Sequence, residues 1–250
     1  MNEELVTALL PILAKRLGVS HAYAFAEFPR ESYQLTITQG FAIEARRRGI
    51  QVTGPASPAA GGDAYMGLAR SLQRDGVDGV LIATYGSQRV AALIRALRAV
   101  YGRSLPIIVS DSMLFGDFLQ QLGRAGQGIY ISGAKIEDPK HQLPAEGRQF
   151  VRAFSATQPG RVVNAFTPYT AQATELLLAA IGRSDGSRAS VLRELRRAEV
   201  RNGILGSFSF DANGDMTVNR MPVFRSRAAN HPAGPFEVFQ LIDIRSEPTG

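Results

Sequence analysis

Apolar residues recur most regularly between positions 76 and 113, and their spacing predicts a strand, a helix and a second strand. Residues 77–83 form a nearly unbroken apolar run between Gly76 and Gly86, which is typical of a strand buried on both faces of a parallel sheet. Apolar side chains at 90, 93, 94, 97 and 100 share one helical face, and residues 105–109 form a second apolar run. The pattern predicts a β-α-β unit with a right-handed crossover.

The alternation of strands and helices continues on both sides of this unit. Helices are predicted at 3–17, 32–48, 63–75 and 114–122, and strands at 21–27, 50–53 and 128–132. Residues 134–144 have the prolines and charges of a linker, and helices at 145–157, 168–181 and 188–199 follow it. Residues 204–210 alternate, residues 211–215 predict a hairpin turn with Asn213-Gly214 at its tip, residues 221–225 resume an extended pattern, and residues 236–244 predict a final strand. The predicted fold class is α/β, a three-layer open parallel sheet flanked by helices.

Two polar residues follow the two central strands. Tyr85 comes after the run at 77–83, and Asp111 comes after the run at 105–109. In open α/β sheets, ligands bind beyond the carboxyl ends of the strands, so these residues are the first candidates for a binding site. Each also suits a purely structural role at a turn or a helix cap.

Composition narrows the function classes. The hydrophobic share of 45% and the charged share of 20% are ordinary for a soluble globular protein, and no apolar stretch approaches the roughly 20 residues of a membrane span. The net charge of +6 comes mostly from arginines scattered over many predicted helices, which argues against a nucleic-acid interface. The N-terminus shows no export signal. The absence of cysteine excludes disulfides, thiolate metal sites and cysteine nucleophiles.

The motifs of common metal, cofactor and catalytic sites fail on inspection. His21, His141 and His231 lie in unrelated segments, and no G-x-S-x-G or phosphate-binding glycine motif is present. The segment DANGD resembles a calcium loop only superficially, because its glycine is misplaced and Pro222 stands where the bidentate glutamate belongs. We therefore expect no metal, no cofactor and no catalytic residues.

Five segments, in order, resemble type I periplasmic binding proteins, specifically the branched-chain amino-acid receptors of ABC transporters. They are AYAFAEFPRESYQ, GVDGVLIATYGSQRVAALIRALRAVYGRSLPIIVSD, GRAGQGIYIS, NAFTPYTAQATELLLAAI and ILGSFSFDANGDM. The last is the most distinctive, because an aromatic-Asp-x-x-Gly-Asp motif before the closing strands is characteristic of that family. The resemblance covers nearly the whole chain.

The resemblance implies a non-enzymatic, extracytoplasmic receptor whose two α/β lobes close on a small polar ligand, such as an amino acid, for uptake or sensing. In the family pattern, the residue at Tyr85 lines the cleft and the acidic residue at Asp111 receives the α-ammonium group of the ligand. Such an ion pair strengthens when closure excludes water. Tyr33 or Phe28 would supply an aromatic wall, and Ser110, next to Asp111, joins the predicted ligand-binding set.

One departure from the family is large. The β-α portion that begins the first lobe, and supplies donors for the ligand carboxylate, is missing. Residues 1–139 then correspond to the second lobe, 140–217 to helices and a hairpin of an incomplete first lobe, and 218–250 to closing strands that return to the α/β lobe. The partners implied are a small ligand, an ABC permease, and a missing N-terminal lobe or partner chain.

Two other functions remain open at this point. The β-α alternation alone also fits an enzyme on a flavodoxin-like or Rossmann-like sheet, since fold does not determine function. The apolar helix near 171–181, for which no covering sheet is predicted, fits a sensory or assembly domain that has lost ligand binding.

Overall fold

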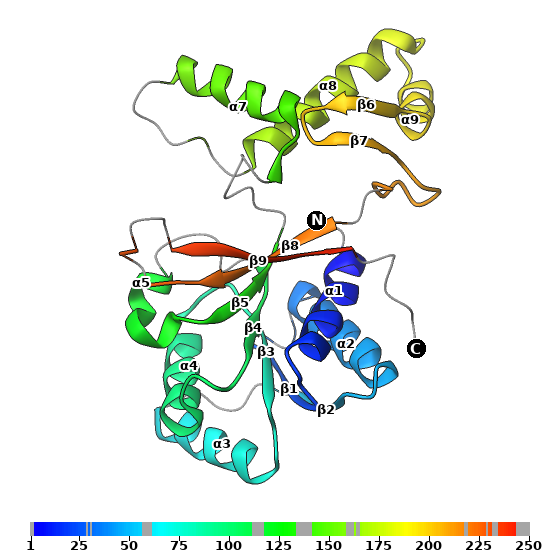
Figure 1. Cartoon of the computed structure of the whole chain (residues 1–250). Coiled ribbons are helices and arrows are strands. Elements are labelled where there is room, and N and C mark those ends of the chain that lie inside the picture. The colour runs from blue at the N-terminus through cyan, green and yellow to red at the C-terminus, as the bar shows by residue number, and fades with distance from the viewer. Residues whose placement is uncertain are drawn as a thin grey trace. The chain divides into compact units, whose positions relative to one another are not determined.

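The computed structural model describes residues 3–28, 30, 32–56, 62–111, 118–133, 142–158, 163, 166–217, 220–228, 230–231 and 235–243. The chain divides into two compact units. Unit 1 comprises Met1–Ala134 and Arg220–Gly250, and unit 2 comprises Lys135–Asn219 (Figure 1). Unit 2 is therefore inserted into the chain of unit 1.

Unit 1 is built on a seven-stranded sheet with the order β2-β1-β3-β4-β5-β8-β9. Strands β1 to β5 are parallel, while β8 pairs antiparallel with β5 and β9 antiparallel with β8. This arrangement confirms the predicted α/β fold class. The strands are β1 His21–Ala26, β2 Gln51–Ala56, β3 Gly79–Ala83, β4 Ile107–Val109, β5 Ile129–Ser132, β8 Arg220–Ser226 and β9 Phe236–Asp243.

Helices cover both faces of this sheet (Figure 1). One face carries α1 Glu3–Arg16 and α2 Ser32–Arg47, and the other carries α3 Gly62–Arg74, α4 Gln88–Tyr101, α5 Phe118–Leu122 and the short 3-10 helix η2 Gly123–Gly126. Along β3, Val80 and Ile82 belong to the core on the α3–α4 face, whereas Leu81 and Ala83 belong to the core on the α1–α2 face. Both sides of β3 are buried, which is why its sequence is apolar throughout.

The central helix α4 shows how local sequence sets the element boundaries. The Ser87 hydroxyl caps its start, accepting hydrogen bonds from the amides of Arg89 and Val90 at 3.2 and 3.4 Å. Gly102 ends it with a φ of 69°, a conformation that glycine adopts without strain. The predicted β-α-β unit is thus confirmed.

Unit 2 contains α7 Ala145–Thr157, α8 Thr167–Arg183 and α9 Arg188–Arg196, followed by the antiparallel strands β6 Glu199–Gly203 and β7 Gly206–Ser209. The prediction of a helix to residue 199 was wrong at its end, because residues 199–203 form β6. The sequence EVRNG alternates too little to reveal a strand, and pairing with β7 defines it.

The predicted hairpin turn at residues 211–215 is present. The Asp211 carboxylate accepts hydrogen bonds from the amides of Asn213 and Asp215, both at 3.0 Å, and a bridge between Phe210 and Met216 closes the turn. Residues 220–226, part of which was predicted to be extended, form β8. This strand belongs to the sheet of unit 1, where Val223 is fully buried.

The two units differ sharply in how much apolar surface they bury. Among the described residues of unit 2, the buried hydrophobic side chains are Leu143, Ala180, Ala198, Ile204 and Phe208, and neither large core cluster includes them. Helix α8 instead exposes apolar side chains along one stripe: Leu177, Leu178 and Ile181. No helix in the described ranges is both long and apolar enough to span a membrane.

A glycine contact in the core of unit 1 gives a stability prediction. A Cβ at Gly79 would lie 2.6 Å from a Val19 methyl group, and β-branched Val19 has little freedom to move. Gly79→Val should therefore lower the free energy of unfolding by about 1–3 kcal/mol, measured by urea denaturation. The control is Gly67→Ala at an exposed position of α3, where a Cβ meets nothing within 4 Å; it should raise stability by up to about 1 kcal/mol. Equal effects of both substitutions would contradict this packing.

Candidate functional site

Three neighbouring strands of unit 1 end at the same edge of the sheet. Strands β1, β3 and β4 are adjacent and parallel, so the residues that follow them lie close together. Glu27 follows β1, Thr84 and Tyr85 follow β3, and Ser110 and Asp111 follow β4. The side chains at this edge form two layers, one buried and one reachable by solvent.

The buried layer consists of Glu27, Thr84 and Ser110, which are 1%, 0% and 0% exposed. The Thr84 hydroxyl donates to the Glu27 carboxylate at 2.5 Å. On its other side, the Ser110 hydroxyl accepts from the Thr84 amide at 3.3 Å and donates to the Thr84 carbonyl at 3.1 Å. Thr84 therefore links the ends of β1 and β4, and its hydroxyl, amide and carbonyl groups all have hydrogen-bond partners although the residue is fully buried.

The outer layer consists of Tyr33, Tyr85 and Asp111. Tyr33, from the first turn of α2, donates its hydroxyl hydrogen to a carboxylate oxygen of Asp111. Its ring stacks on that of Tyr85, with 6.1 Å between ring centroids and an interplanar angle of 22°. Tyr85 remains 53% exposed. The three side chains predicted from separate segments of the sequence thus form one continuous group.

Gln34 holds the segment that positions Tyr33. Its side chain is fully buried, and its carbonyl oxygen accepts a hydrogen bond from the Phe28 amide at 2.8 Å. This bond ties the chain leaving β1 to the start of α2. The Phe28 ring is 45% exposed, but no described ring contact joins it to Tyr33 or Tyr85.

The remaining predicted residue, Ser110, is present at the edge but fully buried, with its hydroxyl bonded to the backbone of Thr84. Sequence reasoning missed Glu27 and Thr84. One signal was available, since Glu27 is an acidic residue directly after an apolar strand, the same pattern that singled out Asp111. Nothing in the sequence alone pairs Glu27 with Thr84.

The chemistry available at this edge is that of one accessible carboxylate beside two aromatic rings. Asp111 can accept hydrogen bonds from an ammonium group, and stacked aromatic faces attract cations and cover apolar groups. Within the described part of the chain, no cluster of three or more histidine, aspartate or glutamate side chains is arranged to hold a metal ion. The edge is therefore suited to binding a small organic ligand.

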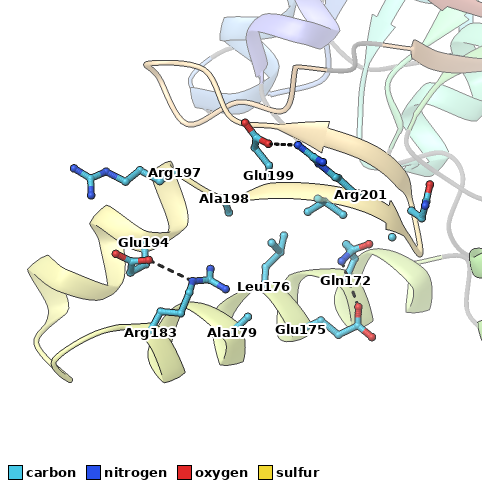
Figure 2. Close-up of a pocket in the computed structure, with 13 residues that line it drawn as sticks. Gln172, Glu175, Leu176, Ala179, Arg183, Glu194, Arg197, Ala198, Glu199 and Arg201 are labelled. Carbon is cyan, nitrogen blue, oxygen red and sulfur yellow. Dashed lines mark hydrogen bonds and ion pairs between the residues drawn. The ribbon is translucent and has the colours of Figure 1, made fainter.

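A separate depression of about 470 Å³ lies within unit 2, between α8, α9 and β6 (Figure 2). It contains none of the predicted site residues, and its lining includes three glutamates and three arginines. Several of these charges pair with one another: Arg183 meets Glu194 at 3.3 Å and Arg201 meets Glu199 at 3.3 Å. Such solvent-exposed pairs contribute little energy, and their charges balance. The chemistry for ligand binding is stronger at the strand-end edge.

The chain matches one protein family over most of its length. The sequence pattern of the periplasmic binding proteins matches residues 2–231. The chain belongs to the periplasmic binding protein family. This is a family of solute receptors rather than of enzymes. No match was found among curated protein sequences.

Solved structures of periplasmic binding proteins share this fold. A leucine-binding protein from Thermotoga maritima superposes with a TM-score of 0.76 at 21% identity, over 96% of this chain and 66% of its own. A substrate-binding protein from Desulfitobacterium hafniense, solved with Leu, gives 0.73 at 20% identity, over 96% and 65%. An R. palustris solute-binding protein, solved with benzoate, gives 0.69 at 16% identity, over 96% and 63%. The chain therefore spans slightly less than two thirds of the length of these relatives.

The hydrogen bond from Tyr33 to Asp111 gives a prediction for this periplasmic binding protein. Tyr33→Phe removes a donor to a partly buried carboxylate and should lower the free energy of unfolding by about 1–2 kcal/mol in urea denaturation. The control is Tyr101→Phe. The buried Tyr101 hydroxyl has no hydrogen-bond partner among the described residues, and burial raises its pKa to about 12. Losing that hydroxyl should be neutral or stabilising. A loss as large as that of Tyr33→Phe would contradict this account.

Proposed function

We propose that this chain is the ligand-binding part of an extracytoplasmic receptor for a small ligand with an ammonium group, namely an amino acid. The observation that carries the proposal is Asp111, an accessible carboxylate at a strand end, set beside the stacked rings of Tyr33 and Tyr85. Family membership supports the receptor role, and the relative solved with Leu supports the ligand class. Delivery to an ABC permease is the function that the family suggests.

The roles proposed for the site residues follow from their exposure. A carboxylate has about four lone-pair positions, so Asp111 can keep its bond to Tyr33 and still accept hydrogen bonds from an ammonium group. The exposed faces of Tyr85 and Phe28 cover the ligand side chain. Buried Ser110 supports the site from beneath, because its hydroxyl is engaged with Thr84.

The binding proposal predicts discrimination between leucine and 4-methylpentanoate, which is leucine without its amino group. By calorimetry, the wild-type protein should bind leucine at least about tenfold more tightly, because only leucine offers an ammonium donor to Asp111. Asp111→Asn should remove most of that preference. Asp63→Asn, which removes an exposed carboxylate from the start of α3, should keep it.

Two results would count against the proposed site. Equal affinity for both compounds in the wild-type protein would remove the role of the ammonium group. A preference that survives Asp111→Asn would place the ammonium partner elsewhere. Benzoate, the compound in one relative, serves as a third probe, since it carries no ammonium group.

We further propose that unit 2 belongs to a lobe whose core is completed by another polypeptide segment, of the kind that forms the remaining third of the relatives. The small number of buried apolar residues in unit 2 and the exposed stripe on α8 support this proposal. A helix with an apolar stripe needs a facing layer. In this scheme, unit 1 corresponds to the complete second lobe, and unit 2 to part of the first.

The α8 stripe gives a test that is independent of ligand. Replacing Leu177 and Leu178 by lysine should change the free energy of unfolding by less than about 0.5 kcal/mol per site, because both are solvent-exposed. The same variant should bind less of the hydrophobic dye ANS than the wild-type protein. A much larger decrease in the free energy of unfolding would show that other residues of this chain already cover the stripe. The control is lysine at Ala179, which is also exposed but lies on another face of α8 and should leave dye binding unchanged.

A further inference from the structure

We infer that Glu27 is a positioning residue for the proposed binding site, acting through the turn after β3 to fix the ring of Tyr85. The inference rests on the function proposed above and extends it. Glu27 is 1% exposed, so its carboxylate lies beneath the edge rather than on it. It therefore sets the geometry of the site without meeting the ligand.

The Glu27 carboxylate contacts two consecutive residues of that turn directly and a third through Thr84. One oxygen of its carboxylate accepts from the Thr84 hydroxyl at 2.5 Å and from the Tyr85 amide at 3.3 Å. The Thr84 hydroxyl oxygen in turn accepts from the Gly86 amide at 2.8 Å. The Glu27 amide donates to the Ala83 carbonyl at 3.1 Å, which extends the pairing with β3 one residue beyond the end of β1. The turn is thus held from the end of β1.

The turn needs such acceptors because the sheet no longer provides them. Strand β3 ends at Ala83, and the chain then bends to bring Tyr85 to the surface. Gly86 has a φ of 83°, and a Cβ there would lie 3.3 Å from the Phe118 ring, so this bend requires glycine. The Glu27 carboxylate accepts a hydrogen bond from the Tyr85 amide, and the Thr84 hydroxyl accepts one from the Gly86 amide. Because of the bend, these two amides follow the end of β3 and cannot pair within the sheet. Hydrogen bonds to a buried charged acceptor are among the stronger ones in proteins.

Fixing this turn fixes the ring that the proposed ligand would meet. The Tyr85 side chain is half exposed, and its ring stacks on that of Tyr33. If the backbone of this turn is already fixed, less conformational entropy is lost when a ligand binds, and the affinity is higher. Glu27 thereby connects the buried layer of the site to its outer layer.

Amide hydrogen exchange by NMR tests the positioning role without any ligand. Glu27→Leu removes the acceptor of the Tyr85 amide at similar volume, so exchange at Tyr85 should rise at least about tenfold relative to Ile82 in the interior of β3. Glu27→Gln keeps an acceptor oxygen and should restore most of the protection. Unchanged exchange at Tyr85 in Glu27→Leu would overturn the inference.

The matched control is Asp78→Asn at the opposite end of the same two strands. The Asp78 carboxylate precedes β3 and accepts from the amides of Ser20 and His21 at 3.0 and 2.8 Å. This substitution should lower global stability while leaving exchange at Tyr85 and Gly86 unchanged relative to Ile82. If it accelerates them equally, Glu27 acts only through overall stability, and the positioning role fails.

A second variant covers the case in which Glu27→Leu does not fold. Thr84→Val deletes the hydroxyl at nearly constant volume, so Gly86 loses its acceptor while Tyr85 keeps the Glu27 carboxylate. Exchange should then rise at Gly86 alone, and Thr84→Ser should reverse it. Accelerated exchange at neither amide would overturn the inference.

Leucine binding provides the functional arm. Glu27→Leu should weaken leucine binding about tenfold, and Glu27→Gln should recover most of it. Faster exchange at Tyr85 with unchanged leucine affinity would show that the turn does not position the site. If wild-type protein binds neither leucine nor benzoate, the proposed function fails, while the exchange results still decide whether Glu27 holds the turn.

Discussion

Burial of the central parallel strands on both faces is the constraint on which this structure depends. Strands β1, β3 and β4 are neighbours in the sheet, and the first polar residues after them are still buried. These residues must therefore form their hydrogen bonds within the protein rather than with water. Thr84 meets this requirement by bonding to Glu27 on one side and Ser110 on the other. The apolar core and the polar edge are therefore consequences of the same packing.

The edge of the sheet has one set of side chains that is buried and another set that reaches the surface. The buried side chains are paired with one another, whereas Tyr85 and Asp111, each the next residue along its chain segment, reach the surface. Residues that contact a ligand can then vary in sequence while the edge beneath them stays in place. Such a division suits a family whose solved members carry ligands as different as Leu and benzoate. In the site proposed above, the outer side chains rather than the sheet would meet the ligand.

Sequence predicted those features that are local. An apolar run shows where a strand ends, so Tyr85 and Asp111 were identifiable, and helical spacing with Gly102 defined α4. The contact of Glu27 with Thr84 joins residues 57 positions apart and leaves no local mark. Strand β6 was missed because its residues are mostly exposed and acquire extended structure by pairing with β7. Likewise, the partner of β8 depended on which core could bury Val223.

The insertion of unit 2 into unit 1 has a consequence for synthesis on the ribosome. Strand β5 emerges before unit 2, but its neighbour β8 is made only afterwards. At translation rates of roughly 5–20 residues per second, the edge of β5 waits on the order of ten seconds for its partner. An open edge of this kind is a template for pairing with other chains, so the nascent protein passes through an interval of aggregation risk that the finished fold does not show.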